Sequence, residues 1–389
     1  MPCRGSLAER EYNRKQHLYA QTYFHALYAT STTILSHSCA VLYTLQRITL
    51  FPTSHELSMM NQVTDWPSFN WKRRFVIVTG GGGFLGRYVV DKLLERGVPI
   101  DRLLVPRQQA YDLRRHDAIE QLFADAYAAG ASADQIYLIH LAATSGGIGY
   151  NRQYPGTLVY DNVMMQTQLL EAARQHNIAK FVGIGSVSAY PKYAPVPFQV
   201  EDLWNGYPEE NTAPYGVAKK VLLVQCQAYR QQFGFDAIYL LPVNLYGPSD
   251  RFEAGSANVI PDLIRKFSYA ATNQLPTVTA WGDGSPTREF LFVADAAEAI
   301  VKATERYSDS QPVNIGSGVE INIHDLAQLI GRLTNFTGQI EWDTSKPNGQ
   351  PRRKLDTAPA QRLFGFTPST DLETGLRKTI DWYQKTIKP

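Results

Sequence analysis

Short apolar runs alternate with longer amphipathic stretches from residue 74 onward. The runs "RFVIVTG" (74–80), "QIYLIHLAA" (135–143) and "DAIYLLPVN" (236–244) are rich in aliphatic and β-branched residues, as buried strands are. The stretches "RYVVDKLLERG" (87–97) and "VMMQTQLLEAARQHN" (163–177) carry apolar residues at helical spacing. Because strands alternate with helices along the chain, the pattern predicts an α/β fold with a doubly wound, mostly parallel sheet.

A glycine-rich turn joins the first predicted strand to the first predicted helix. Gly80, Gly83 and Gly86 are separated by two residues each. In this context glycines let the backbone approach a pyrophosphate, and the helix N-terminus offers free N–H groups and a positive dipole end. The turn therefore predicts a dinucleotide site in a Rossmann-type domain.

The end of the second predicted strand bears on which dinucleotide binds. An acidic residue there would bind a ribose 2′-hydroxyl, whereas an arginine suits a 2′-phosphate. The sequence reads "LLVPRQQAYDL", with Arg107 near the expected place and no carboxylate directly after the strand. We expect NADP as the cofactor, with NAD as the alternative; a solvated surface arginine is the structural alternative for Arg107.

The chain divides into three parts by composition. Residues 1–73 lack a clear period and predict a poorly ordered extension, a weak targeting segment or sequence ahead of the native start. Residues 74–246, with 291–316 returning to them, are expected to form the dinucleotide-binding domain. Residues 247–290 and 317–389 alternate less regularly and predict a smaller, mixed α/β substrate domain.

Composition narrows the class of protein further. The 389 residues are 44% hydrophobic and 19% charged, which suits a globular chain, and the net charge of +2 gives no reason to expect nucleic acid or an anionic membrane as partner. Cys3, Cys39 and Cys226 are few and far apart, which argues against disulfides and against a cysteine metal site. We find no apolar run long enough to span a bilayer and expect a cytoplasmic protein without a metal.

The stretch "APYGVAKK" (213–220) places Tyr215 four residues before Lys219. On a helix these side chains lie one turn apart on the same face. An ammonium held beside a phenol stabilises the phenolate, so the pair predicts a tyrosine acid–base catalyst with a lowered pKa. An accidental pair on a solvated helix is the alternative.

Together these motifs resemble the extended short-chain dehydrogenase/reductase family, also called the NAD-dependent epimerase/dehydratase family. "TGGGGFLG", "HLAA", "YGVAK", "PVNLYGP" and "REFLFVAD" occur in its order and spacing. Within the family, "GGIGYN", "NTAPYGVAK" and "NVIPDLIRKF" look most like the GDP-L-fucose synthase branch.

The resemblance implies a role for individual residues. Tyr215 would exchange a proton with a sugar oxygen, Lys219 would assist it and bind the nicotinamide ribose, and Ser186 would donate to the same oxygen. Further cofactor contacts would surround the glycine turn and the strand ends, at Phe84, Leu85, Asp112, Leu113, Ala142, Ala143 and Asn244. The nucleotide-sugar side would fall on Ser188, Asn258, Lys266, Trp281, Arg288 and Arg353. The family also implies a homodimer, in which two helices of each copy form a four-helix bundle.

The chain departs from the fucose synthase pattern at two positions. That branch epimerises C3 and C5 with a cysteine two residues after the catalytic serine and a histidine just before "VIP". Ser188 and Asn258 stand there in this chain. Neither is a base or acid poised near neutral pH, so we expect reduction at C4 without the double epimerisation.

Three functions compete at this stage. The first is an NADP-dependent reductase that acts on the 4-keto group of a nucleotide-linked sugar, and the second is a 4-epimerase that retains NAD. The third is a non-catalytic dinucleotide-binding protein, which would need none of Ser186, Tyr215 and Lys219. Arg107 favours the first, and the sequence names neither the base nor the sugar.

Overall fold

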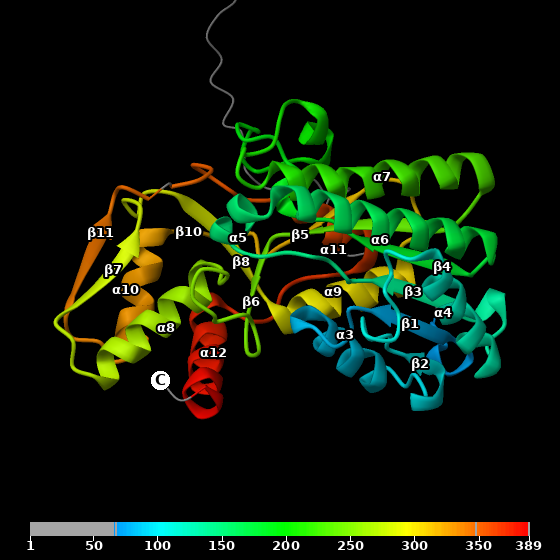
Figure 1. Ribbon diagram of the computed structural model, residues 1–389, viewed down its shortest axis with the longest axis horizontal. Coiled ribbons are helices and arrows are strands. Elements are labelled where there is room, and N and C mark those ends of the chain that lie inside the picture. The colour runs from blue at the N-terminus through cyan, green and yellow to red at the C-terminus, as the bar shows by residue number, and fades with distance from the viewer. Residues whose placement is uncertain (1–65, 67, 347, 388–389) are drawn as a thin grey trace, which may run out of the picture. The chain divides into compact units, whose positions relative to one another are not determined.

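The computed structural model describes Trp66, residues 68–346 and residues 348–387. Its main sheet is parallel, with the strand order β2-β1-β3-β4-β5-β9 in the described part (Figure 1). The strands are β1 (Phe75–Thr79), β2 (Leu103–Leu104), β3 (Ile136–His140), β4 (Lys180–Ile184), β5 (Ala237–Pro242) and β9 (Val313–Ile315).

Helices cover both faces of this sheet (Figure 1). On one face α3 packs against α9, which also contacts α11, and on the other face α6 packs against α4 and α7. The predicted doubly wound α/β fold is therefore confirmed. These helices are α3 (Phe84–Glu95), α4 (His116–Ala128), α6 (Pro155–Gln175), α7 (Ala213–Phe233), α9 (Val293–Arg306) and α11 (Ala358–Phe364).

The local sequence explains where these elements begin and end. All five residues of β1, β3 and β4 are buried, as their continuous apolar runs predict for a sheet covered on both faces. Helix α7 has Pro214 in its first turn, where a missing N–H costs nothing, and it stops at Gly234, which adopts a left-handed conformation with φ 65°.

The carboxyl ends of β1 and β3 open the crevice of the fold. These neighbouring strands continue into α3, on one face of the sheet, and into the segment leading to α5 (Ile148–Gln153) and α6, on the other face. In open α/β sheets, ligands bind where the strand order reverses in this way.

The C-terminal third adds two small sheets and a group of helices. Strand β8 pairs with β6 in parallel and with β10 in antiparallel fashion, and β7 pairs with β11 in parallel. The strands are β6 (Asn244–Tyr246), β7 (Thr277–Trp281), β8 (Thr287–Phe292), β10 (Glu320–Asn322) and β11 (Gln339–Asp343). The helices are α8 (Val259–Thr272), α10 (Ile323–Leu333) and α12 (Leu372–Thr386).

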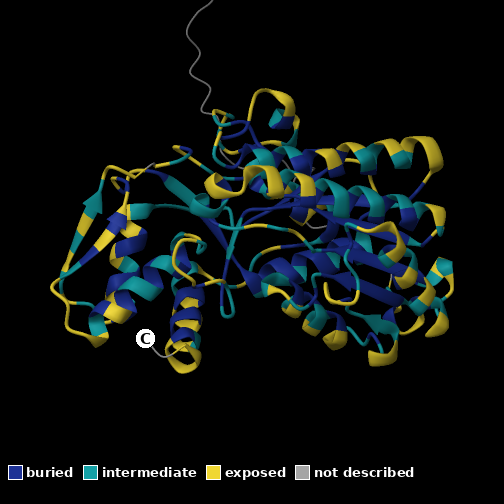
Figure 2. Cartoon of the chain, viewed as in Figure 1, coloured by how far each residue is buried: buried dark blue, intermediate teal, exposed yellow. Residues whose placement is uncertain are grey.

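Buried apolar residues form two clusters. In Figure 2 the buried positions, in dark blue, follow the strands of the main sheet. The larger cluster underlies the main sheet and includes residues of α9 and β9. The smaller one joins α8, α10 and α12 to β7 and β8. We propose that the two clusters mark the two domains, because α9 and β9 return to the first of them as the sequence predicts.

Most of the predicted extension, residues 1–65 and residue 67, lies outside the described residues. Its last residues belong to the folded unit. Trp71 is 3% exposed, and its Nε1 donates a 2.7 Å hydrogen bond to Glu305 of α9. The folded part thus starts before the predicted boundary at residue 74. No helix in the described ranges has the length and apolar character needed to cross a bilayer.

Candidate active site

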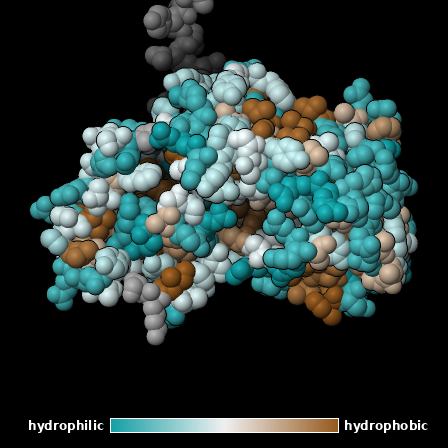
Figure 3. All heavy atoms as spheres, viewed as in Figure 1, coloured by the Kyte–Doolittle hydropathy of each residue, from teal (hydrophilic) through white to brown (hydrophobic). Residues whose placement is uncertain are grey.

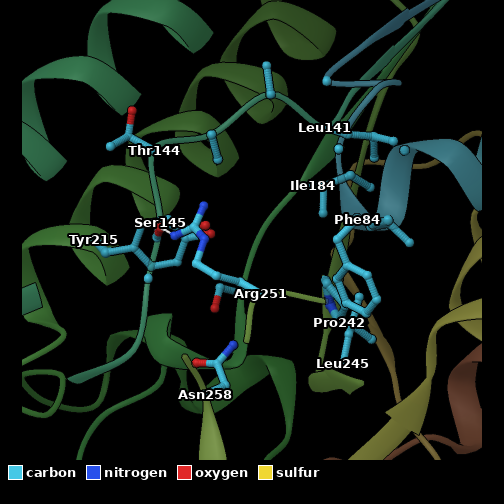
Figure 4. A pocket seen from close by; sticks show the side chains of 18 of the residues that line it. Phe84, Leu141, Thr144, Ser145, Ile184, Tyr215, Pro242, Leu245, Arg251 and Asn258 are labelled. Carbon is cyan, nitrogen blue, oxygen red and sulfur yellow. Dashed lines mark hydrogen bonds between the residues drawn. The ribbon is translucent and has the colours of Figure 1, made fainter. Parts of the chain in front are cut away.

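A cavity of about 840 Å³ lies over the carboxyl ends of the main strands. Its two walls differ in character (Figure 4). One wall is apolar and comes from the glycine turn and the strand ends, with Phe84, Leu141, Ile184, Pro242 and Leu245. The other is polar and holds Thr144, Ser145, Tyr215, Arg251 and Asn258. Such a cavity can hold a flat apolar ring against one wall and a sugar against the other.

The glycine turn lies next to the apolar wall of the cavity. Gly80 has φ +71°, and a Cβ on it would lie 2.6 Å from the backbone nitrogen of Ala142, so the turn needs glycine there. Helix α3 begins directly after Gly83, with no side chain capping its first N–H groups. Those N–H groups and the positive end of the helix dipole are free to bind a pyrophosphate.

The side chain of Arg107 lies against this turn. Its guanidinium contacts Gly82 so closely that any Cβ at that position would overlap it. The side chain is exposed and lines the cavity. A cation next to a glycine turn fits a dinucleotide that carries an additional phosphate.

Asp112 also lines the cavity, but its carboxylate is engaged by the protein. Arg114 bonds it with Nε at 2.9 Å and Nη2 at 2.8 Å, and the Arg114 guanidinium holds the pKa of Asp112 below its usual range. Arg114 also reaches Asp161 at 3.2 Å. The ion pairs of Arg114 with these two carboxylates fix the loop beside the turn.

The other predicted cofactor residues that line the cavity are Gly80, Gly83, Phe84, Leu85, Gly86, Leu113, Ala142, Ala143, Lys219 and Asn244.

Helix α7 brings the predicted catalytic pair to the cavity. Tyr215 lies in its first turn, and Lys219 follows one turn later with its Nζ 5.8 Å from the centre of the tyrosine ring. Gly216 packs on the carbonyl oxygen of Ser188 so closely that a Cβ would not fit. The glycine therefore lets the helix carry Tyr215 up against the loop after β4.

Ser186 lies two residues after the end of β4 and is the N-cap of the short 3₁₀ helix η4 (Val187–Ala189). Its Oγ accepts a 3.1 Å hydrogen bond from the backbone nitrogen of Ser188. The hydroxyl proton of Ser186 is not used in this bond, so it can be donated to an oxygen in the cavity. Ser186, Tyr215 and Lys219 thus line one cavity, as the resemblance implies.

The pKa values correct one prediction. Burial raises the pKa of Tyr215 to about 12 and lowers the pKa of Lys219 to about 8. The sequence predicts a lowered tyrosine pKa, and in the protein alone this is wrong, because withdrawing the phenol from water outweighs the nearby ammonium. Tyr215 is therefore a protonated phenol at neutral pH.

Two arginines lie near the far end of the cavity. Arg353 lines the cavity and donates hydrogen bonds to Gln350 Oε1 at 3.1 Å and to Asn244 Oδ1 at 3.4 Å. Arg288 donates hydrogen bonds to the backbone carbonyls of Thr287 and Asn348. Among the described residues, no carboxylate lies within 4.0 Å of either guanidinium. Burial lowers the pKa of Arg353 to about 10, and burial with the charge of Arg353 lowers that of Arg288 to about 9. Two half-buried cations without a carboxylate partner suit an anionic ligand.

The other predicted substrate residues are divided by the structure. Ser188 and Asn258 line the cavity, whereas Lys266, Trp281 and Arg288 do not. Lys266 pairs with Asp262 at 2.9 Å and lies with its Nζ 5.7 Å from the centre of the Trp281 ring, which is 50% exposed. Lys266 and Trp281 form a separate pair between α8 and β7.

Sequence reasoning missed two residues that follow β6. Asp250 and Arg251 line the cavity. Oδ2 of Asp250 is buried and accepts no hydrogen bond from the described residues, and burial raises the pKa of this carboxyl to about 7. A signal was present in the sequence, since "NLYGPSDR" puts two charges directly after a strand end.

Three comparisons place the chain among known proteins. Residues 76–316 match the model of the NAD dependent epimerase/dehydratase family. GDP-L-fucose synthase 1 of Arabidopsis thaliana is 38% identical over 320 residues, which cover 82% of this chain and 96% of that protein.

Solved structures give the same result. A GDP-L-fucose synthetase from Naegleria fowleri bound to NADP has a TM-score of 0.72 and 26% identity, covering 83% of this chain and 97% of its own. A GDP-mannoheptose C4 reductase from Campylobacter jejuni with NADP bound has a TM-score of 0.71 and 25% identity, covering 82% and 100%. The chain belongs to the NAD dependent epimerase/dehydratase family.

Proposed function

We propose that this protein is an NADP-dependent reductase of the 4-keto group of a nucleotide-diphosphate sugar. One observation carries the proposal: a single cavity holds the glycine turn with Arg107 and also Ser186, Tyr215 and Lys219. A dinucleotide-binding protein without activity would have no use for the last three. The relatives named above, a fucose synthase and a C4 reductase, support a guanosine diphosphate sugar as substrate.

The residues divide the work of the reaction. NADPH supplies a hydride when it is bound. Ser186 donates its hydroxyl proton in a hydrogen bond to the keto oxygen, which polarises the carbonyl. Tyr215 transfers its phenolic proton to the same oxygen as negative charge develops there, and the Lys219 ammonium stabilises the phenolate that remains.

The protonation state of Tyr215 is compatible with the reducing direction. A pKa of about 12 keeps the phenol protonated at neutral pH, and reduction of a ketone requires a proton donor at this place. A 4-epimerase must begin instead with a phenolate that removes a proton from a hydroxyl. The relatives with NADP bound, a fucose synthetase and a C4 reductase, support the reductase over the epimerase.

Arg353 and Arg288 are proposed to bind the diphosphate. Their charges lack carboxylate partners among the described residues, and a planar guanidinium can give two parallel bonds to a phosphate. We further propose that the exposed ring of Trp281, with Lys266 beside it, holds the base outside the cavity, since an aromatic face accepts both a cation and a stacked ring.

The test is to supply GDP-4-keto-6-deoxymannose and NADPH in D₂O. The product should be reduced at C4 and carry no deuterium at C3 or C5, because Ser188 and Asn258 cannot supply the base and acid. Failure to oxidise NADPH would refute the reductase, whereas rapid deuterium incorporation would show that other residues epimerise the sugar. The variant Ser188→Cys/Asn258→His should gain exchange at these carbons.

We also propose a homodimer formed through α6 and α7. The outer face of α7 presents Val221 and Val224, exposed by 38% and 48%, beside a groove of about 740 Å³ that Trp204 and Tyr207 line. Apolar side chains gather over α7 on the surface (Figure 3). Light scattering should give twice the monomer mass, and Val224→Glu should shift it to the monomer; a monomeric wild-type protein would contradict the proposal.

The low number of cysteines supports the cytoplasm as the proposed location.

A further inference from the structure

Tyr239, a buried phenol of β5, lies between the two segments that carry the reacting groups. It is 2% exposed, and the whole of β5 is buried. The register of the parallel strands pairs it with Gly183 of β4, and paired residues present their side chains to the same face of the sheet. Helix α7 packs against both strands. The side chain of Tyr239 is therefore enclosed between the sheet and the helix that carries Tyr215 and Lys219.

The hydroxyl of Tyr239 binds the backbone of this helix. It donates a buried 2.7 Å hydrogen bond to the backbone carbonyl of Lys219. A helical carbonyl also accepts the N–H of the residue four positions later, and its second lone pair can accept the phenol. Burial raises the pKa of Tyr239 well above its ordinary value of 10.0, so the phenol remains a donor at neutral pH. The bond fixes the turn of α7 that carries the catalytic lysine.

The ring of Tyr239 contacts the segment between β4 and Ser186. Gly185, the residue before Ser186, lies so close to the ring and the hydroxyl that a Cβ would not fit. The backbone nitrogen of Gly185 also donates a 2.7 Å hydrogen bond to the carbonyl of Leu240, the next residue of β5. Tyr239 therefore contacts the backbone beside Ser186 and the backbone of Lys219 at the same time.

This double contact bears on the reaction because two donors must meet one oxygen. Ser186 and Tyr215 are both proposed to reach the keto oxygen, but one follows β4 and the other lies in the first turn of α7. The contact of Gly216 with Ser188 fixes one point of the helix against the segment after β4. Tyr239 fixes a second point one turn further along, and two points set the direction of the helix as well as its distance. A displacement of about 1 Å between reacting groups can cost roughly 10²-fold in rate.

We infer that Tyr239 is a positioning residue of the reaction, which holds α7 where Ser186 and Tyr215 reach the same substrate oxygen. The inference rests on the proposed function, because turnover is its measure. Tyr239 does not line the cavity, so it acts through these two residues and not on the substrate. Loss of its hydroxyl should therefore lower kcat and leave the binding of both ligands unchanged.

Tyr239→Phe tests the inference, because it removes the hydroxyl and keeps the ring. With GDP-4-keto-6-deoxymannose and NADPH, kcat should fall about tenfold, while KM for the sugar nucleotide and the Kd of NADPH stay within about twofold of wild type. The matched control is Tyr307→Phe. Tyr307 is 4% exposed, follows α9 outside the cavity, and also donates to a backbone carbonyl, that of Gln311 at 2.6 Å. Both variants should show a similar small drop in melting temperature, but only Tyr239→Phe should lose turnover.

A double-mutant cycle with Ser186→Ala separates positioning from a general loss of structure. Once the Ser186 hydroxyl is absent, Tyr239→Phe should lower kcat by less than about threefold, because only one donor remains to be placed. Equal tenfold effects in both backgrounds would overturn the inference and leave the proposed function intact. The same holds for a kcat of Tyr239→Phe within about twofold of wild type, or for a loss of turnover that Tyr307→Phe shares. A wild-type protein that does not oxidise NADPH with this substrate would overturn both.

Discussion

The two ends of the cavity hold their charged groups in different ways. At the cofactor end, Arg107 is exposed on a backbone turn, and much of the binding surface is main chain. At the reaction end, Lys219 is 2% exposed, and burial shifts the pKa values of Tyr215 and Arg353. Charges act more strongly where water is excluded. Side-chain changes should therefore cost more at the reaction end than at the cofactor end.

The largest effect should come from Tyr215→Phe. The change removes the proton donor but keeps the ring, so turnover should fall roughly 10²–10⁴-fold while NADP binding stays the same. NADPH oxidation with a 4-keto sugar nucleotide measures the loss. Tyr193→Phe, on a side chain that is 79% exposed and outside the cavity, is the control. Turnover within about threefold of wild type would exclude Tyr215 as the acid.

Arg353→Met should weaken binding of the nucleotide sugar roughly 10- to 100-fold, since charge-assisted bonds to the diphosphate are lost. The melting temperature should not drop in parallel, because the change removes a half-buried charge that has no carboxylate partner among described residues. Arg352→Met, which removes an exposed arginine that pairs with Glu320 at 2.6 Å outside the cavity, is the matched control. An equal loss of binding and of stability would mean that Arg353 is structural.

Arg107→Ala tests the cofactor end. The affinity for NADP should fall by about tenfold and that for NAD should stay nearly constant, because the lost contact is exposed and involves only the extra phosphate. Arg115→Ala, which removes an exposed arginine paired with Asp117, is the control. If both cofactors lose affinity alike, or the wild-type protein prefers NAD, Arg107 does not bind the phosphate.

The smallest effect concerns Asp250. Burial raises the pKa of this carboxyl from its ordinary value of 3.8 to about 7, so the folded state holds a proton that the unfolded state releases. Stability should thus fall as pH rises between about 4 and 7. Asp250→Asn should remove this fall in denaturant titrations, whereas Asp117→Asn, on an exposed acid, should not. An unchanged slope in Asp250→Asn would show that its carboxyl titrates normally.

The cofactor end could be predicted from sequence because its parts are local. A strand, a glycine turn and a helix follow one another directly, and Arg107 comes just after the next strand. The positions of the backbone groups in the turn then follow from the adjoining strand and helix, without contacts to distant parts of the chain. The main sheet and its order of helices follow from the same local patterns.

The reaction end could be predicted only in part. The spacing of Tyr215 and Lys219 placed them together, but the depth of burial that raises the tyrosine pKa depends on the surrounding fold. Arg251 was missed because its position is set by Ser145, which is 106 residues away, and by Phe252 against α12. The sequence also could not show that Trp281 and Lys266 lie outside the cavity, because their strand and helix set that position.

Helix α7 leaves little room for sequence change. Its first turns carry Tyr215 and Lys219, Gly216 allows the close approach to η4, Leu222 and Cys226 are packed inside, and Val221 and Val224 occupy the outer face. In a scan of all single substitutions, this helix should be among the least tolerant segments of the chain. Substitutions on its outer face should also lower the catalytic activity, because the outer face and the catalytic residues belong to one rigid helix.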